Sequence, residues 1–330
     1  MKYATSIMLK LSAIASASVG GWYAGLHYER IQQLNNDKNK GVDTFSCSNF
    51  KLKPGIPIFG TVSAATPFIP DENNNSEMGL KFSSSSGRMA QVLSPIMKYG
   101  FPGLDSVRIF DDFVLSYDRR NRVAHWVFEH LTKENLHKSE DVDRSKSVFK
   151  SDESIHPFFR SSNSDYKGSG YDRGHMAAAG NHQSSQEYVH QTFNLSNIAP
   201  QVGAGFNRDS WNRLESHVRK LTRVYTDVHV CTGPLYLPKK EKDGKKYVKY
   251  EVIGSNHVAV PTHFFKIVVG ETKDSKYEME AYVMPNAPID DNIPLTSFQV
   301  PPESIERAAG LLFFDKLSRS RLTKINGKKV

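Results

Sequence analysis

The chain has 330 residues, with 38% hydrophobic and 24% charged side chains, which is the composition of an ordinary globular protein. Its 43 Lys and Arg outnumber its 35 Asp and Glu, and the net charge of +8 favours a polyanionic partner. The only cysteines are Cys47 and Cys231, so the sequence excludes a disulfide-stapled fold and a cysteine-rich zinc site.

The first 28 residues carry no acidic side chain, since the first acidic residue is Glu29. They contain Lys2, Lys10 and an apolar run over 11–26 that is rich in Ser, Ala and Gly. We therefore interpret residues 1–28 as a targeting or anchoring segment that can contact a membrane. The run is short for a transmembrane helix. A mitochondrial presequence, a short inner-membrane anchor and a secretory signal all fit this composition.

Residues 29–98 are predicted to form a linker followed by a mobile loop. The part from 29 to 49 is polar and rich in Asn and Lys, and the part from 70 to 87 contains three consecutive Asn and four consecutive Ser. Such segments have too few apolar side chains to build a core. We expect ordered structure to begin near Tyr99.

Beyond Tyr99 the sequence alternates between predicted strands and two predicted helices. Strands are expected at 113–117, 124–128, 224–232, 247–253, 264–269 and 278–284. Helices are expected at 207–221, where four large apolar residues share one face, and at 304–314. The elements lack a βαβ rhythm, so we predict an α+β fold with a central antiparallel sheet. Residues 315–330 are expected to form a basic C-terminal tail.

The most informative stretch is Tyr171-Asp172-Arg173-Gly174-His175-Met176-Ala177. A histidine near an aspartate is, by itself, more often a hydrogen-bonded structural residue than a catalytic one. The residues downstream change that interpretation. Leu195-Ser196-Asn197 follows, and the predicted helix then carries Asn207, Glu215 and Arg219.

This ordered set of motifs resembles the DNA/RNA non-specific endonucleases of the ββα-metal class. Their signature is an Asp-Arg-Gly-His strand end, a Leu-Ser-Asn segment and a helix that carries Asn and then Glu. The resemblance covers residues 99–314, which we therefore expect to be a nuclease domain with an embedded ββα-metal motif. It leaves out the N-terminal segment and the loop at 70–87.

The resemblance implies specific roles for the motif residues. His175 is the natural general base, because an imidazole can accept a proton near neutral pH. Asn207 would be the direct ligand of a single Mg²⁺, or of Mn²⁺ in its place, with water in most other positions. Glu215, two turns further along the helix, would hold a metal-bound water. The alternative is that Glu215 is a solvent-exposed carboxylate on the helix with no role in the site. Asp172 would support the motif rather than act as the base.

Three arginines are candidate phosphate contacts, because guanidinium groups suit phosphate oxygens. Arg173 belongs to the signature and is also a candidate catalytic residue, whereas Arg144 lies in an upstream segment that fits the family only loosely. Arg144 could equally be a surface charge. Arg219 lies four residues after Glu215, so it could instead pair with Glu215 on the helix and make no phosphate contact. Asn197 is expected to orient the site, with a turn-forming asparagine as the alternative.

Asn181, His182 and His190 lie near His175 in the sequence and suggest a metal site. Their spacing matches no zinc pattern, and the helix already supplies a metal ligand. We therefore expect His182 and His190 to pack in the interior or lie on the surface.

The resemblance implies an endonuclease that cuts DNA and RNA internally and leaves 5′-phosphate and 3′-hydroxyl ends. It also implies a homodimer, residence in the mitochondrial intermembrane space and relocation to the nucleus during cell death. Two alternatives come from other classes. One is a catalytically silent nucleic-acid-binding protein on a nuclease scaffold, and the other is a membrane-tethered adaptor with a basic surface. Neither of them needs the full set of motif residues.

Overall fold

The computed structural model of the protein describes residues 95–330. The predicted targeting segment and the predicted linker up to residue 94 lie outside the described residues. Within residues 95–330, no helix combines the length and the apolar character needed to cross a membrane.

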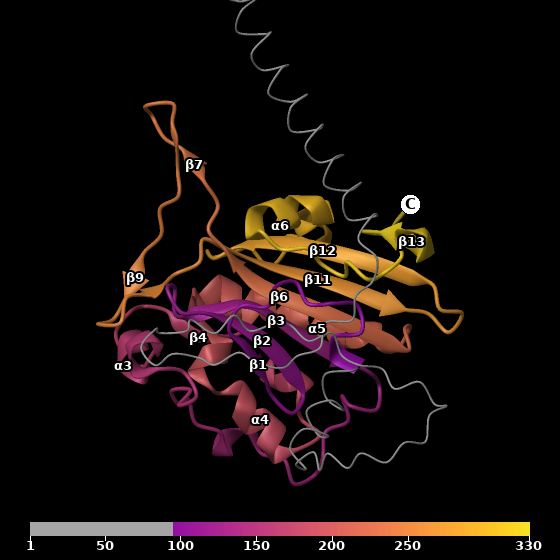
Figure 1. Ribbon diagram of the computed structural model, residues 1–330, viewed down its shortest axis with the longest axis horizontal. Coiled ribbons are helices and arrows are strands. Elements are labelled where there is room, and N and C mark those ends of the chain that lie inside the picture. Colours follow the sequence, from indigo (N-terminus) through magenta and orange to yellow (C-terminus); the bar gives the residue numbers. More distant parts are fainter. Residues whose placement is uncertain (1–94) are drawn as a thin grey trace, which may run out of the picture. The chain divides into compact units, whose positions relative to one another are not determined.

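An eight-stranded sheet forms the centre of the described region (Figure 1). Its strands are β1 (Val107–Ile109), β2 (Phe113–Asp118), β3 (Val123–Leu131), β6 (Asp227–Leu235), β11 (His263–Glu271), β12 (Tyr277–Pro285), β13 (Leu322–Ile325) and β14 (Lys328–Lys329), in that order. All neighbouring strands pair antiparallel except β12 and β13, which are parallel. The predicted α+β class with a central antiparallel sheet is confirmed.

Alternate side chains of the central strands enter two different hydrophobic cores. On β11, Phe264 and Val268 belong to one core, whereas Phe265 and Ile267 belong to the core on the opposite face. This division follows from the two-residue period of a strand. The central strands are apolar on both faces because both faces are covered.

Two helices cover the two faces of the sheet (Figure 1). Helix α5 (Asn212–Leu221) buries Leu214 and Val218 against the first core, as its apolar spacing predicts. Helix α6 (Pro302–Ala309) buries Ile305 against the second core. The smaller helical elements are η1 (Arg144–Lys146), η2 (Pro157–Phe159), α3 (Asn163–Tyr166), η3 (Ala179–Asn181), α4 (Gln186–Thr192), η4 (Leu195–Asn197), η6 (Leu295–Phe298) and η7 (Arg319–Arg321).

A second, two-stranded sheet precedes α5 and completes a ββα unit. Strand β4 (Asp172–His175) pairs antiparallel with β5 (Ile198–Gln201). The chain then enters η5 (Gly203–Trp211), a stretch of wide π-type turns that continues into α5. The predicted ββα arrangement is therefore present, and it packs on the same core as α5.

The predicted helix start at Asn207 falls inside η5, not in a regular α-helix. The Asn207 backbone N–H donates to the Val202 carbonyl across 2.9 Å, which is the five-residue spacing of a π-turn. The backbone is not helical at Ala204 and Gly205, and Gly205 has a φ of 81° that favours glycine. A side chain at Gly205 would also press on Pro288. Regular hydrogen bonding therefore begins only after the turn that carries Asn207.

Three further predicted elements differ from the structure. The strand predicted at 247–253 is wrong, since only β8 (Lys246–Tyr247) and β9 (Val252–Ile253) form, and they pair separately with β7 (Lys239–Lys240) and β10 (Val258–Ala259). The residues between β8 and β9 are exposed, so no core extends the strand. The helix predicted at 304–314 ends at Ala309, because Gly310 adopts a left-handed conformation. The expected basic tail contributes β13 and β14 to the main sheet.

Candidate active site

One cavity of about 330 Å³ brings together six of the seven predicted site residues. They are Arg144, Arg173, His175, Asn207, Glu215 and Arg219. Arg144 lies in η1, and the other five lie in the ββα unit formed by β4, β5, η5 and α5. The seventh residue, Asn197, does not line this cavity.

His175 ends strand β4, and the pairing of β4 with β5 fixes its place on the cavity wall. Gly174 is required beside it, because a Cβ at that position would collide with the side chain of Gln201 on β5. The imidazole packs against the rings of Phe149 and Phe193, whose centroids lie 5.4 and 4.8 Å from its own. The two aromatic rings restrict how the imidazole can turn.

The surroundings of His175 keep its ring neutral. Burial lowers the pKa of His175 to about 3, and the positive charges of Arg144 and His182 act in the same direction. Its Nε2 has no hydrogen-bond partner among residues 95–330. The ring is therefore neutral at physiological pH, which is the form of an imidazole that accepts a proton.

Asp172 fixes the orientation of the Asn207 side chain. The Asn207 Nδ2 donates to Asp172 Oδ2 across 3.0 Å. Arg208 holds the same carboxylate through Nε at 2.8 Å and Nη2 at 2.6 Å, and these bonds keep the pKa of Asp172 below its ordinary value. Because the amide nitrogen is engaged, the amide oxygen of Asn207 is the atom left to hold a cation.

Glu215 lies on α5 and shares the cavity with Asn207. Burial raises the pKa of Glu215 to about 7, although Lys266 and Arg219 act in the opposite direction. A carboxylate in this setting gains from a nearby cation, which favours its ionised form. The exposed-carboxylate alternative is wrong, since Glu215 is not exposed.

The three predicted arginines reach the cavity in different ways. Arg173 Nη1 donates to Asn163 Oδ1 across 2.7 Å, and its guanidinium lies 4.6 Å from the centroid of Phe149. The Arg144 guanidinium lies 5.9 Å from the centroid of Phe193. Arg219 donates to a neutral amide and a hydroxyl rather than to Glu215. With Arg208, which pairs with Asp172, four guanidinium groups line the cavity, and such a set suits an anionic ligand.

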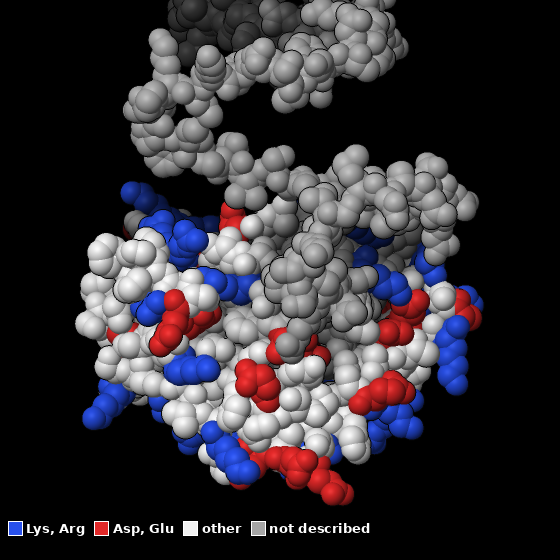
Figure 2. Space-filling model, turned by 60° about the horizontal axis from the view of Figure 1, so that its bottom comes forward, with Lys and Arg blue, Asp and Glu red and all other residues white. Residues whose placement is uncertain are grey.

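The basic excess of the chain is not gathered into one field on the face that Figure 2 presents. There, Lys and Arg side chains are interspersed with Asp and Glu side chains. The positive charges that can act on a phosphate in the cavity are therefore those of the arginines that line it.

Asn197 lies behind the cavity and is fully buried. Its Oδ1 accepts from the Ala177 N–H at 2.8 Å, and its Nδ2 donates to the carbonyls of Ala177 and Thr192 at 3.0 and 2.9 Å. All of these bonds hold backbone, including the segment that follows His175. Asn197 is thus placed to position the site from behind the cavity, whose lining does not include it.

Asn181 and His182 are buried, and the structure engages both in hydrogen bonds to protein side chains. Although burial alone lowers it, hydrogen bonds to Asp112 and Glu129 raise the pKa of His182 to about 9. His190 Nδ1 lies 2.9 Å from the Ser147 hydroxyl. In the part of the chain that the structure describes, no three or more His, Cys, Asp or Glu side chains form a cluster that could hold a metal.

Sequence reasoning missed four residues that shape the site: Arg208, Phe149, Phe193 and Lys266. Lys266 is 1% exposed on β11, where its Nζ donates to Thr232 Oγ1 across 2.6 Å. The sequence did carry one signal for Lys266, because it is the single lysine in the apolar run from 264 to 269. A charge buried in such a run needs a specific partner. The two phenylalanines carry no comparable signal.

Known proteins match the chain over most of its length. The family model for DNA/RNA non-specific endonucleases matches residues 93–320. Mitochondrial endonuclease G of Caenorhabditis elegans is 50% identical over 280 residues, which cover 83% of this chain and 90% of that protein. Mitochondrial endonuclease G of Homo sapiens is 55% identical over 218 residues, which cover 66% of this chain and 72% of that protein.

A solved structure is similar as well. A chain in the crystal structure of the EndoG/EndoGI complex, which concerns the mechanism of EndoG inhibition, superposes with a TM-score of 0.71 at 68% identity. The match covers 74% of this chain and 98% of that chain. The names of the mitochondrial relatives support a mitochondrial location. The chain, whose Asp-Arg-Gly-His motif ends at the cavity, belongs to the DNA/RNA non-specific endonuclease family and is an endonuclease.

Proposed function

We propose that the chain hydrolyses phosphodiester bonds inside DNA and RNA with His175 as the general base, leaving 5′-phosphate and 3′-hydroxyl ends. One observation carries this proposal: a neutral imidazole shares a cavity with four arginines, an amide oxygen and a carboxylate. Hydrolysis of a phosphodiester requires a base for the attacking water and neutralisation of charge at phosphorus. The cavity supplies both.

The side chains divide the reaction between them. The guanidinium groups of Arg144, Arg173 and Arg219 hold the non-bridging oxygens, and their hydrogen bonds strengthen as negative charge builds up. His175 takes a proton from the attacking water while the new bond from oxygen to phosphorus forms. The bond between phosphorus and the 3′ oxygen then breaks, which gives the proposed ends.

The family is one of metal-dependent nucleases, and the cavity fits a single Mg²⁺ or Mn²⁺. The Asn207 amide oxygen is the proposed direct ligand, because Asp172 already engages the amide nitrogen. Glu215 would hold a water bound to the ion. When bound, the ion stabilises charge on the phosphate and the leaving oxygen. Hard oxygen donors with many retained waters are the surroundings that Mg²⁺ prefers.

Lack of discrimination between DNA and RNA follows from the contacts that the cavity offers. Its charged residues suit phosphate, which DNA and RNA share. Contacts to phosphate position a nucleic acid but carry no sequence information. We therefore expect cleavage of single-stranded and double-stranded substrates of either sugar.

We further propose a homodimer that resides in the mitochondrial intermembrane space and relocates to the nucleus during cell death. Residues 1–28 would direct or anchor it, as their acid-free composition suggests. The mitochondrial names of the relatives support the compartment. A nuclease without sequence preference would damage nuclear DNA, so confinement also has a chemical reason.

Plasmid nicking with and without EDTA tests the proposed function. The purified chain should nick supercoiled plasmid and degrade single-stranded RNA in Mg²⁺, should stop in EDTA and should recover when Mg²⁺ is restored. A catalytically silent binder would instead retard the plasmid on a gel without cutting it under any of these conditions.

A further inference from the structure

The guanidinium of Arg219 is held in the active-site cavity by two neutral groups. Its Nη1 donates to Asn181 Oδ1 across 3.0 Å, and its Nη2 donates to Ser216 Oγ across 2.9 Å. Neither acceptor carries a charge, so these two hydrogen bonds orient the guanidinium without neutralising it. A carboxylate in either place would form a charge-assisted pair and compete with a phosphate for the same N–H groups.

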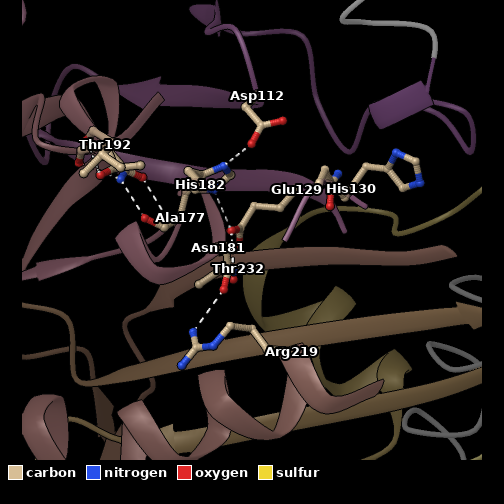
Figure 3. Close-up of polar contacts among 12 residues, drawn as sticks. Asp112, Glu129, His130, Ala177, Asn181, His182, Thr192, Arg219 and Thr232 are labelled. Atoms are coloured by element: carbon tan, nitrogen blue, oxygen red, sulfur yellow. Dashed lines mark hydrogen bonds and ion pairs between the residues drawn. The ribbon is translucent and has the colours of Figure 1, made fainter. Parts of the chain in front are cut away.

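Asn181 lies between Arg219 and a buried carboxylate (Figure 3). It is 3% exposed at the end of η3, and its Nδ2 donates to Glu129 Oε1 across 2.8 Å. The side-chain amide therefore accepts from the arginine at one end and donates to the carboxylate at the other. This arrangement separates the two opposite charges and fixes the amide by both ends.

Other groups compensate the charge of Glu129. His182 Nε2 lies 3.0 Å from Glu129 Oε1, and His182 Nδ1 lies 2.6 Å from Asp112 Oδ2 (Figure 3). Glu129 and His182 are both fully buried, and Lys266 adds a second positive charge near Glu129. A buried carboxylate with such partners has no need of the Arg219 charge.

We propose that Asn181 is a positioning residue, which orients Arg219 toward the reacting phosphate through a neutral oxygen and so does not pair its guanidinium with a carboxylate. Glu129, His182 and Asp112 form the rigid support that holds the Asn181 amide in this orientation. The inference rests on the proposed function, in which Arg219 contacts the phosphate. It adds residues that do not themselves touch the substrate.

A double-mutant cycle tests the orientation. Asn181→Ala should lower kcat on an oligonucleotide about tenfold to a hundredfold, because a misplaced catalytic group costs that much. In the Arg219→Ala background the same substitution should cost nothing further, whereas in the Arg144→Ala background it should keep its full effect. An equal loss in the wild-type and Arg219→Ala backgrounds would overturn the inference. Asn135→Ala, which removes hydrogen bonds in a turn after β3, controls for general destabilisation.

Two variants at Ser216 test whether the acceptors of Arg219 must be neutral, even if Asn181→Ala fails to fold. Ser216 is half-buried on α5, three residues before Arg219, so Ser216→Asp places a carboxylate beside the guanidinium. It should weaken DNA binding and make the slope of log K against log salt less negative by about 0.9, as if one phosphate contact were lost. Ser216→Ala, its uncharged match, should leave that slope unchanged. Equal slopes for both variants would overturn the inference.

The outcomes also separate this inference from the nuclease proposal. If Arg219→Ala cuts at the wild-type rate while His175→Ala does not, the role of Asn181 is refuted and the nuclease proposal stands. If neither substitution affects cleavage, both proposals are wrong.

Discussion

The Asn207 side-chain amide donates to the Asp172 carboxylate across 3.0 Å, and this bond joins the first strand of the ββα unit to its helical segment. Arg208 holds the same carboxylate with two further hydrogen bonds. The carboxylate therefore determines which end of the amide is left for a cation. Asp172, a motif residue that does not line the cavity, thus orients the side chain of Asn207, which does.

Asp172→Asn should raise the Mg²⁺ concentration needed for half-maximal cleavage about tenfold or more, with most of kcat recovered at saturation. The reason is that a group that orients a metal ligand typically changes metal affinity by about that factor. A Mg²⁺ titration of plasmid cleavage measures the shift. Asp105→Asn, at an exposed position, is the matched control. An unchanged Mg²⁺ requirement in Asp172→Asn would contradict the proposed orientation.

Asn207→Ala should raise the Mg²⁺ requirement more than Glu215→Ala does, and its activity should not recover fully at saturation. The proposed direct ligand is lost in the first variant, whereas the second loses only a hold on a metal-bound water. Titrating both variants with Mg²⁺ under the same conditions compares them. A larger loss of metal affinity in Glu215→Ala would reverse the two assignments.

The buried His182 should make the fold less stable at alkaline pH. Its pKa is about 9 in the fold and 6.5 ordinarily, so its contribution is fully present below pH 6.5 and is lost as the pH rises through 9. His182→Gln should lower the free energy of unfolding at pH 6 and flatten its decline between pH 6.5 and 9. Urea unfolding at several pH values measures this, with the exposed His137→Gln as control. An identical pH dependence in wild type and His182→Gln would refute it.

Residues 1–60 fused to a fluorescent protein should collect in mitochondria, and the chain without them should remain an active nuclease. The basis is the acid-free composition of residues 1–28 on a body similar to mitochondrial nucleases. Imaging with mitochondrial and endoplasmic-reticulum markers distinguishes a presequence from a secretory signal. Secretion of the fusion would refute the mitochondrial compartment and leave the nuclease proposal intact.

The sequence predicted the elements whose apolar pattern depends on local geometry. The β2–β3 hairpin and the buried face of α5 follow from periods of two and of 3.6 residues. It did not predict that η5 has π-type turns, because no apolar period marks them; the turn at Gly205 also lies against Pro288, which comes from a distant segment. The strands β13 and β14 were also missed, since a basic, weakly apolar segment gains its pairing only from the edge of β12.

The same division applies to the active site. His175 and Asn207 were predictable because the motif places them in order along the chain, and the fold brings them to one cavity. Phe149 and Arg208 could not be assigned, because each acts through a partner that only the folded chain brings near it. Lys266 stood out as a lone lysine in an apolar run, but its contact with Trp211 exists only in the folded chain. Arg144 shows the intermediate case. Its segment fits the family loosely, yet it reaches the same cavity.

His175→Ala tests the central claim most directly. We expect the rate of plasmid nicking to fall by about two to four orders of magnitude, which is the usual contribution of a positioned general base. DNA affinity, measured in Ca²⁺ or EDTA, should stay near the wild-type value because the four cavity arginines remain. The exposed His137→Ala should cut normally. A His175→Ala variant that is folded and nicks DNA at nearly the wild-type rate would contradict the proposed mechanism.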